Sequence, residues 1–77
     1  MDLNEFVVNF ADQIDDVDVD TIKADTEFKD LEEWSSMSAL AVIAMVDAEY
    51  DVQIKGDDIR NSETIEDLYN RVKELKG

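Results

Sequence analysis

Residues 34–50 read Trp-Ser-Ser-Met-Ser-Ala-Leu-Ala-Val-Ile-Ala-Met-Val-Asp-Ala-Glu-Tyr, and the rest of the chain is arranged around this stretch. Serines stand at its start, where the N-cap of a helix belongs, and no charge follows before Asp47. The pattern predicts a central helix over residues 36–50 that displays Ser36 at its beginning. Its expected inner stripe is Ala39, Ile43, Val46 and Tyr50, with Val42 and Leu40 beside it.

Helical periodicity continues on both sides of the central stretch. A first helix is expected over residues 3–14, with Asp2 or Asn4 as its cap, and a last helix follows Ser62 or Thr64. The last helix begins with acidic residues and ends with basic ones, as the helix dipole prefers. Both segments therefore read as main helices of a bundle.

The connections complete a small all-α fold. Residues 15–27 alternate Asp and Val like a strand, but no second strand is present to pair with them, so a long first loop is expected. A short helix is expected over residues 57–61. Three apolar residues look like anchors for the long loop: Phe28, Leu31 and Trp34. The sequence thus predicts one domain over residues 1–77, a small all-α bundle of three main helices and one short helix with a long first loop.

The chain is strongly acidic, with 21 acidic and 7 basic residues and a formal net charge of −14. Such a field repels nucleic acid and anionic membrane surfaces and attracts partners with Lys and Arg patches. Solubility alone is the other interpretation, and composition leaves both open. Residues 37–46 are too short an apolar run to span a membrane, and the acidic start is unlike a signal peptide. We expect a cytoplasmic protein and a monomer.

The chain contains no cysteine and no histidine. A disulfide framework and a Ser-His-Asp triad are therefore excluded, and no acid–base–nucleophile set is present. We expect a protein that is not an enzyme in its own right. Any thiol or acyl chemistry would need a reactive group that is added to the chain later.

The long loop contains a possible calcium motif. Asp16, Asp18 and Asp20 occupy positions one, three and five of a twelve-residue frame that ends at Glu27, which is the ligand spacing of an EF-hand. However, Thr21 stands where the sharp turn needs a glycine, and a lysine stands where an apolar residue normally packs. A loose, nonspecific cation site is the favoured interpretation, with no dedicated metal site, and a calcium-binding loop stays as an alternative.

The serine cluster also has two interpretations. Ser35 or Ser36 can cap the helix by accepting hydrogen bonds from backbone N–H groups of the first turn. Capping alone does not explain why an uncharged, mostly apolar helix follows directly in such an acidic chain. The residues are compatible with a functional serine and with a purely capping one.

Four segments, taken in order, resemble the acyl carrier protein family. The family pattern begins with roughly Phe-x-x-Asp-Leu-Gly-x-Asp-Ser-Leu, which is followed by an aliphatic helix. It continues with Glu-x-x-Phe-x-Ile-x-Ile and ends with a last helix that begins at a Thr. The matching segments are Phe28-Lys29-Asp30-Leu31, Ser36-Met37, Val46-Asp47-Ala48-Glu49-Tyr50-Asp51-Val52-Gln53-Ile54 and Thr64-Ile65-Glu66-Asp67-Leu68. The resemblance covers nearly the whole chain, including its length and acidity. The ordered set is more specific than any single motif.

The resemblance implies 4′-phosphopantetheine attached covalently to Ser36, with Ser35 as the fallback. The arm ends in a thiol that carries acyl groups as thioesters, which fits the missing cysteine. The implied partners are a phosphopantetheinyl transferase and acyl-processing enzymes of fatty-acid or specialised lipid or polyketide biosynthesis, which present basic docking patches. The residues assigned to partner recognition are Met37, Ala41, Asp47 and Glu49.

The chain departs from the family pattern directly before Ser36. Ser35 stands where the family has an Asp that helps to bind the metal used by the modifying transferase, and Trp34 stands where a smaller residue is usual. Glu32 and Glu33 replace the family Gly and lengthen the segment by one residue. These departures favour a specialised carrier over the housekeeping carrier of fatty-acid synthesis.

Three functions are thus weighed: an acyl carrier, an unmodified acidic interaction module whose alanine-rich helix docks a partner, and a calcium-binding loop protein. For the carrier, we expect the cargo to tuck between helices that leave only a small or closed cavity when unloaded. The residues expected around it are Ile43, Met45, Val46, Ile54, Ile59, Leu68 and Tyr69.

Overall fold

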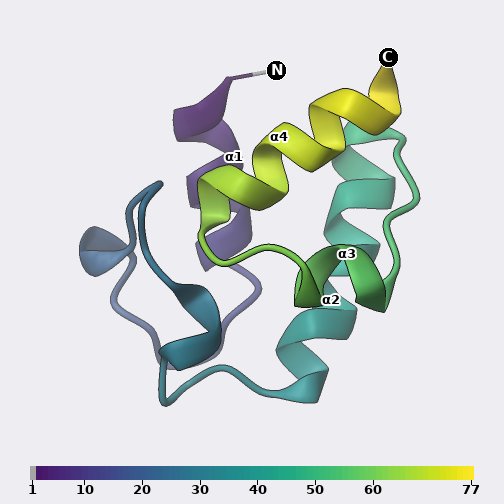
Figure 1. Cartoon of the computed structure of the whole chain (residues 1–77). Coiled ribbons are helices and arrows are strands. Elements are labelled where there is room, and N and C mark those ends of the chain that lie inside the picture. The colour runs from purple at the N-terminus through teal and green to yellow at the C-terminus, as the bar shows by residue number, and fades with distance from the viewer. Residues whose placement is uncertain (1) are drawn as a thin grey trace.

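The computed structural model describes residues 2–77, so Met1 of the expected domain lies outside the described residues. The elements are α1 (Leu3–Ala11), η1 (Val19–Thr21), η2 (Phe28–Asp30), α2 (Ser36–Tyr50), α3 (Gly56–Arg60) and α4 (Ile65–Lys76), where η marks a 3-10 helix (Figure 1). The part of the chain that the structure describes forms no β-strand. The all-α prediction is confirmed, with three main helices, one short helix and a long first loop.

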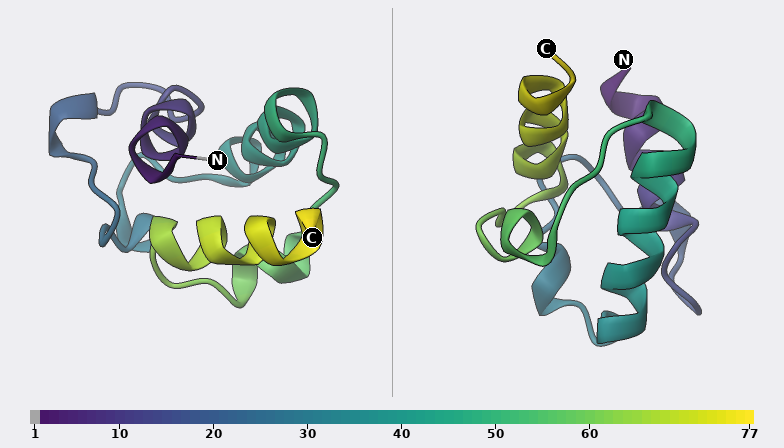
Figure 2. Two further views of the ribbon diagram at one scale, coloured as in Figure 1. Left: turned by 90° about the horizontal axis from the view of Figure 1, so that it is seen from above. Right: turned by 90° about the vertical axis from the view of Figure 1, so that its right-hand side faces the viewer.

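The helices form two layers. α1 and α2 lie side by side, and α4 crosses them on one face of the pair (Figures 1 and 2). α3 contacts both α2 and α4. The start of α2 and the two ends of the chain lie at opposite ends of the bundle (Figure 1). The serines that open α2 are therefore presented away from both termini.

Capping groups set the helix boundaries. Asp2 Oδ1 accepts a hydrogen bond from the N–H of Asn4 (2.9 Å), and Thr64 Oγ1 accepts one from the N–H of Asp67 (3.1 Å). These bonds satisfy donors that the first turn of a helix leaves without a partner. At the other end of α2, Asp51 adopts the left-handed conformation, with φ of 56°, and ends the helix.

One apolar core receives side chains from all four α-helices. Its largest fully buried members are Phe6, Phe10, Phe28, Val42, Val46, Ile65, Leu68 and Val72. The inner face of α2 differs from the expected stripe, because Met45 is in the core whereas Leu40 is 66% exposed. α1 also ends earlier than expected, at Ala11, and Ile14 is buried from the turn that follows the helix.

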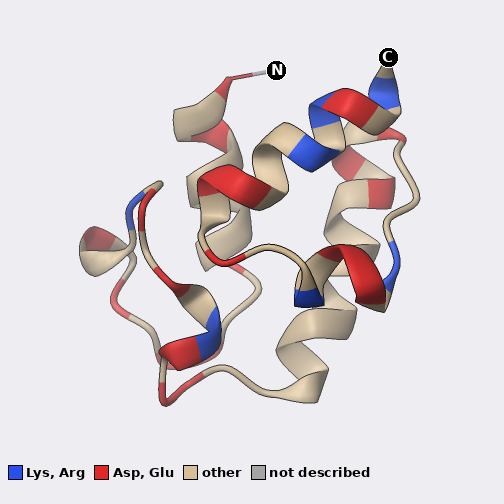
Figure 3. Ribbon diagram, in the orientation of Figure 1, with Lys and Arg blue, Asp and Glu red and all other residues tan. Residues whose placement is uncertain are grey.

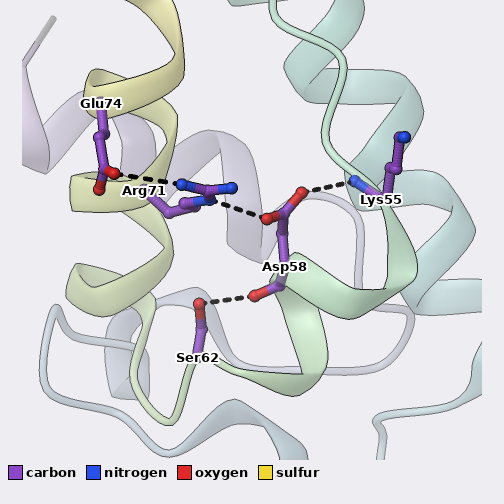
Figure 4. A network of polar contacts seen from close by, with 5 residues as sticks. All are labelled: Lys55, Asp58, Ser62, Arg71 and Glu74. Atoms are coloured by element: carbon purple, nitrogen blue, oxygen red, sulfur yellow. Dashed lines mark hydrogen bonds and ion pairs between the residues drawn. The ribbon is translucent and has the colours of Figure 1, made fainter.

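α3 is only five residues long and buries one apolar side chain, so polar contacts hold it in place. Arg71 of α4 donates through Nε to Asp58 Oδ1 (2.8 Å) and through Nη1 to Glu74 Oε1 (3.2 Å) (Figure 4). The backbone N–H of Lys55 donates to Asp58 Oδ2 (2.9 Å), and the Ser62 hydroxyl donates to the Asp58 carbonyl (2.8 Å). The Arg71 guanidinium and then the Lys55 N–H lower the pKa of Asp58 below its usual value, because both favour the carboxylate.

The long loop is bonded to the helices that follow α2. The first two backbone N–H groups of α4 donate to the carbonyl groups of Thr26 (3.3 Å) and Ala24 (2.9 Å). Lys29 Nζ donates to the carbonyl of Arg60 at the end of α3 (2.7 Å). The anchors predicted for this loop all pack on the core, namely Phe28, Leu31 and Trp34.

Candidate functional site

The serines at the start of α2 occupy three different environments. Ser35 is the N-cap, and its Oγ accepts a hydrogen bond from the N–H of Ser38 (3.3 Å). Ser38 is 6% exposed, and its Oγ lies 3.3 Å from that of Ser35. Ser36 is the first residue of the helix and is exposed, and its hydroxyl has no hydrogen-bond partner within residues 2–77. Ser35 is exposed as well, so the difference is that the Ser36 hydroxyl is not engaged by any hydrogen bond within the described residues.

The start of α2 suits a negatively charged group. The N–H groups that begin a helix lack backbone partners and carry the positive end of the helix dipole, so they favour anions. The first turn of α2 contains no acidic residue. Figure 3 shows that the first turns of α2 carry no charge at all, although acidic residues are frequent on the loops and the other helices. The site therefore fits a phosphodiester on Ser36.

The four residues expected to recognise partners do not share one surface. Met37 is 79% exposed, Ala41 is half-buried, and Asp47 and Glu49 are exposed near the end of α2. At 3.6 residues per turn, Glu49 lies about 120° around the helix from Met37. A partner that covers Met37 therefore approaches from a different direction from one that contacts Glu49.

The exposure of one apolar residue of α2, Leu40, was missed from the sequence. Leu40, 66% exposed, and Ala44, also exposed, lie at the i+3 and i+7 positions from Met37, on the same side of the helix. The i+3 spacing from Met37 was the sequence signal for an exposed Leu40, but Leu40 was expected beside the inner stripe of the helix. Together with Met37 they form an exposed apolar strip along one side of α2 that starts beside Ser36.

Two open grooves flank α2. The first has a volume of about 350 Å³ and is lined by Leu40, Ile43, Ala44, Asp47, Gln53, Ile54 and Lys55. The second has a volume of about 320 Å³ and is lined by Asp12, Gln13, Asp15, Glu33, Ser35, Met37, Ser38 and Ala41. Among the residues expected around an acyl chain, Ile43 thus lines an open groove, whereas Val46 and Leu68 are fully buried.

The acidic loop does not have the geometry of a calcium site. Asp18 Oδ1 accepts a hydrogen bond from the N–H of Asp20 (3.0 Å) and caps η1, and Asp16 has a left-handed backbone with φ of 63°. Between residues 2 and 77, no three His, Cys, Asp or Glu side chains gather as ligands for a metal ion. The structure gives no support to the calcium interpretation.

An all-α bundle that presents an open serine hydroxyl at the start of its central helix has the architecture of a carrier domain. Comparison with protein-family models matches residues 5–72 to the family described as phosphopantetheine attachment site. The chain belongs to this family, and its resemblance to acyl carrier proteins is confirmed. Comparison with solved structures gives no significant match.

Family membership establishes the cofactor as covalently attached 4′-phosphopantetheine and the chain as a carrier protein. The covalent arm distinguishes it from the unmodified interaction module that the sequence left open. Carrier domains of this family are generally not catalytic, and they interact with a phosphopantetheinyl transferase and with biosynthetic enzymes. None of the helices described is long and apolar enough to cross a membrane.

Proposed function

We propose that Ser36 carries the 4′-phosphopantetheine arm and that the protein presents acyl groups to enzymes of fatty-acid or specialised lipid or polyketide biosynthesis. The main support is the exposed Ser36 hydroxyl, which stands between the capping Ser35 and the buried Ser38. When attached, the arm supplies the thiol that holds each acyl group as a thioester. The polypeptide holds the attachment point at a helix start whose field favours the phosphate.

The surface around Ser36 supports docking of enzymes with mixed apolar and basic patches. Met37 and the half-buried Ala41 offer apolar contact near the attachment point. Asp47 offers a charge further along α2, and Glu49 offers one on a different side. In this arrangement the apolar contacts contribute affinity, and the carboxylates steer a basic partner during encounter. Residues 1–77 would act as one domain, as a monomer in the cytoplasm.

The groove beside α2 supports an acyl cargo in preference to a polar aminoacyl one. Its lining includes the apolar side chains of Leu40, Ile43, Ala44 and Ile54. An acyl chain in this groove would remove apolar surface from water, at about 25 cal/mol for each Å² buried. The polar part of the lining is limited to Asp47, Gln53 and Lys55, and a polar cargo would bury less apolar surface against the other four residues.

Intact-mass spectrometry after co-expression with a broad-specificity phosphopantetheinyl transferase tests the attachment. The wild-type chain should gain the mass of one arm, and Ser36→Ala should gain none. Ser36→Ala should keep its helical circular dichroism, because Ser35 and not Ser36 caps α2.

The matched control is Ser35→Ala, which loses a cap worth about 1 kcal/mol but keeps the open hydroxyl. It should still gain one arm, located at Ser36 by peptide mapping. An arm on Ser36→Ala together with no arm on Ser35→Ala would assign the attachment to Ser35 and contradict the proposal.

A further inference from the structure

The geometry points to Trp34 as a positioning residue, whose indole ring holds the segment that presents Ser36 to the modifying and loading enzymes. Trp34 comes directly before the capping Ser35. The inference rests on the proposed attachment at Ser36. It assigns to Trp34 a role that is exercised through the segment it anchors and not through the attachment of the arm.

The indole is the third ring of an aromatic cluster. It is stacked on Phe10 of α1, with centroids 5.8 Å apart and an angle of 4° between the ring planes. It also meets Phe28 of η2 edge to face, with centroids 4.9 Å apart and an angle of 63°. Phe10 and Phe28 are themselves in edge contact at 5.0 Å, and both have an exposed fraction of 0%. Trp34 is therefore packed against two fixed rings from two different elements.

Backbone hydrogen bonds join this cluster to the first turn of α2. The N–H of Leu31 donates to the carbonyl of Phe28 (3.2 Å), and the N–H of Trp34 donates to the carbonyl of Leu31 (3.1 Å). One residue later, the Ser35 carbonyl accepts from the N–H of Ala39 (3.1 Å). The chain from η2 to α2 is thus a series of short turns, and Trp34 is its last anchor before Ser36.

Between η2 and α2, Leu31 is the other described side chain that packs on the core, and it lies four residues further from Ser36 than Ser35 does. Within residues 31–35, Glu32, Glu33 and Ser35 are exposed, and the side chains that pack on the core are those of Leu31 and Trp34. In α2 itself, the first fully buried apolar residue is Val42, more than one turn beyond Ser36. Loss of the indole should therefore leave α2 folded while its first turn and the preceding loop become mobile.

A mobile first turn would reduce the population of molecules that an enzyme can bind productively. Apparent affinity falls in proportion to that population, whereas the rate within the bound complex does not. If the competent fraction falls to about one tenth, the KM for the carrier rises about tenfold with kcat nearly unchanged. A residue that only stabilised the fold would not raise KM at an unchanged kcat while the protein remains folded.

The test is steady-state kinetics of a phosphopantetheinyl transferase acting on the full apo chain, with a fluorescent coenzyme A conjugate as the donor. Trp34→Ala should raise KM about tenfold with kcat nearly unchanged, and Trp34→Phe, which keeps a ring, should restore most of the affinity. Leu31→Ala is the matched control, because it removes a core contact from the same segment but leaves the stacked rings in place. In ¹⁵N relaxation, the amides of Ser36 and Met37 should lose order in Trp34→Ala and not in Leu31→Ala.

Equal KM values for Trp34→Ala and Leu31→Ala, or no recovery in Trp34→Phe, would overturn the inference. If Trp34→Ala does not fold, Trp34→Leu replaces it, because leucine retains apolar contact without a ring and should still raise KM. Peptide mapping of the wild-type product separates the two proposals. An arm on Ser36 with unchanged KM values rejects the positioning role alone, whereas an arm on Ser35 rejects both.

Discussion

Ser35 and Ser36 are adjacent in the chain, but their hydroxyl groups do different things. The Ser35 hydroxyl accepts the hydrogen bond that caps α2, and it also lies against the buried Ser38 hydroxyl. The Ser36 hydroxyl stands outside this pair. The sequence could not separate them, since either serine can cap a helix. A one-residue difference in where the helix begins decides which hydroxyl is engaged and which is open.

The cap makes a stability prediction at the residue scale. Ser35→Ala should destabilise the protein by about 1 kcal/mol, because the N–H of Ser38 loses its acceptor. In a domain of this size, that change lowers Tm by about 4–8 °C, which differential scanning calorimetry resolves. Ser35→Asp is the control, because aspartate caps as well as serine does and should leave Tm near the wild-type value. Equal Tm values for Ser35→Ala and the wild type would show that the cap contributes nothing.

At the scale of elements, the position of α3 depends on one carboxylate. Asp58 is hydrogen-bonded by Arg71 and by the backbone N–H of Lys55, and its pKa is lowered from an ordinary value of 3.8. A carboxyl group with a lowered folded-state pKa stabilises the fold fully above its ordinary pKa and loses this contribution as pH falls through the folded value. Asp58→Asn should therefore have a lower Tm than the wild type at pH 7, and the gap should begin to narrow below about pH 4 and shrink further as pH falls towards the lowered pKa of Asp58.

The neighbouring carboxylate provides the control for this pH profile. Asp57 pairs with Arg60 on the surface, and both side chains are 73% exposed. Asp57→Asn removes the same charge from the same helix but should change Tm little, because exposed ion pairs contribute little to stability. Thermal unfolding of both variants between pH 3 and pH 7 compares them directly. A gap for Asp58→Asn that stays constant with pH would show that its carboxylate is not the group responsible.

Helix boundaries were more predictable than helix orientation. Residues that cap, such as Asp2 and Thr64, carry their signal in the sequence, and the predicted start and end of α2 agree with the structure. α2 is apolar on nearly all sides before Asp47, so its periodicity did not distinguish the face that contains Met45 from the face that contains Leu40. Only the packing of α1 and α3 against it makes that choice. The exposed apolar strip of Met37, Leu40 and Ala44 could not be separated from the core for the same reason.

At the scale of the whole molecule, electrostatic repulsion opposes folding. The net charge is −14 over 77 residues, and Figure 3 shows acidic residues distributed over the loops and helices. We expect Tm to rise with added NaCl, because salt screens the repulsion, and to rise further with millimolar Mg²⁺ at matched ionic strength through loose binding. A Tm that does not change with salt would contradict this expectation. A one-to-one micromolar calcium isotherm that is lost in Glu27→Gln would instead revive the calcium interpretation.

The C-terminal end of the chain is fastened to the end of α2 that lies farthest from Ser36, and α1 is bonded to the same residue, Tyr50. Lys76 Nζ donates to the Tyr50 carbonyl (2.8 Å), and Asn9 Nδ2 donates to the Tyr50 hydroxyl (2.9 Å). From Tyr50, α2 runs back to Ser36 over about 21 Å, at about 1.5 Å per residue. A fusion partner, a neighbouring module or a solid support joined to either terminus would therefore stand about a helix length from Ser36 (Figure 1). Several such domains could be joined in series through their termini, and the start of every α2 would remain accessible to a different enzyme.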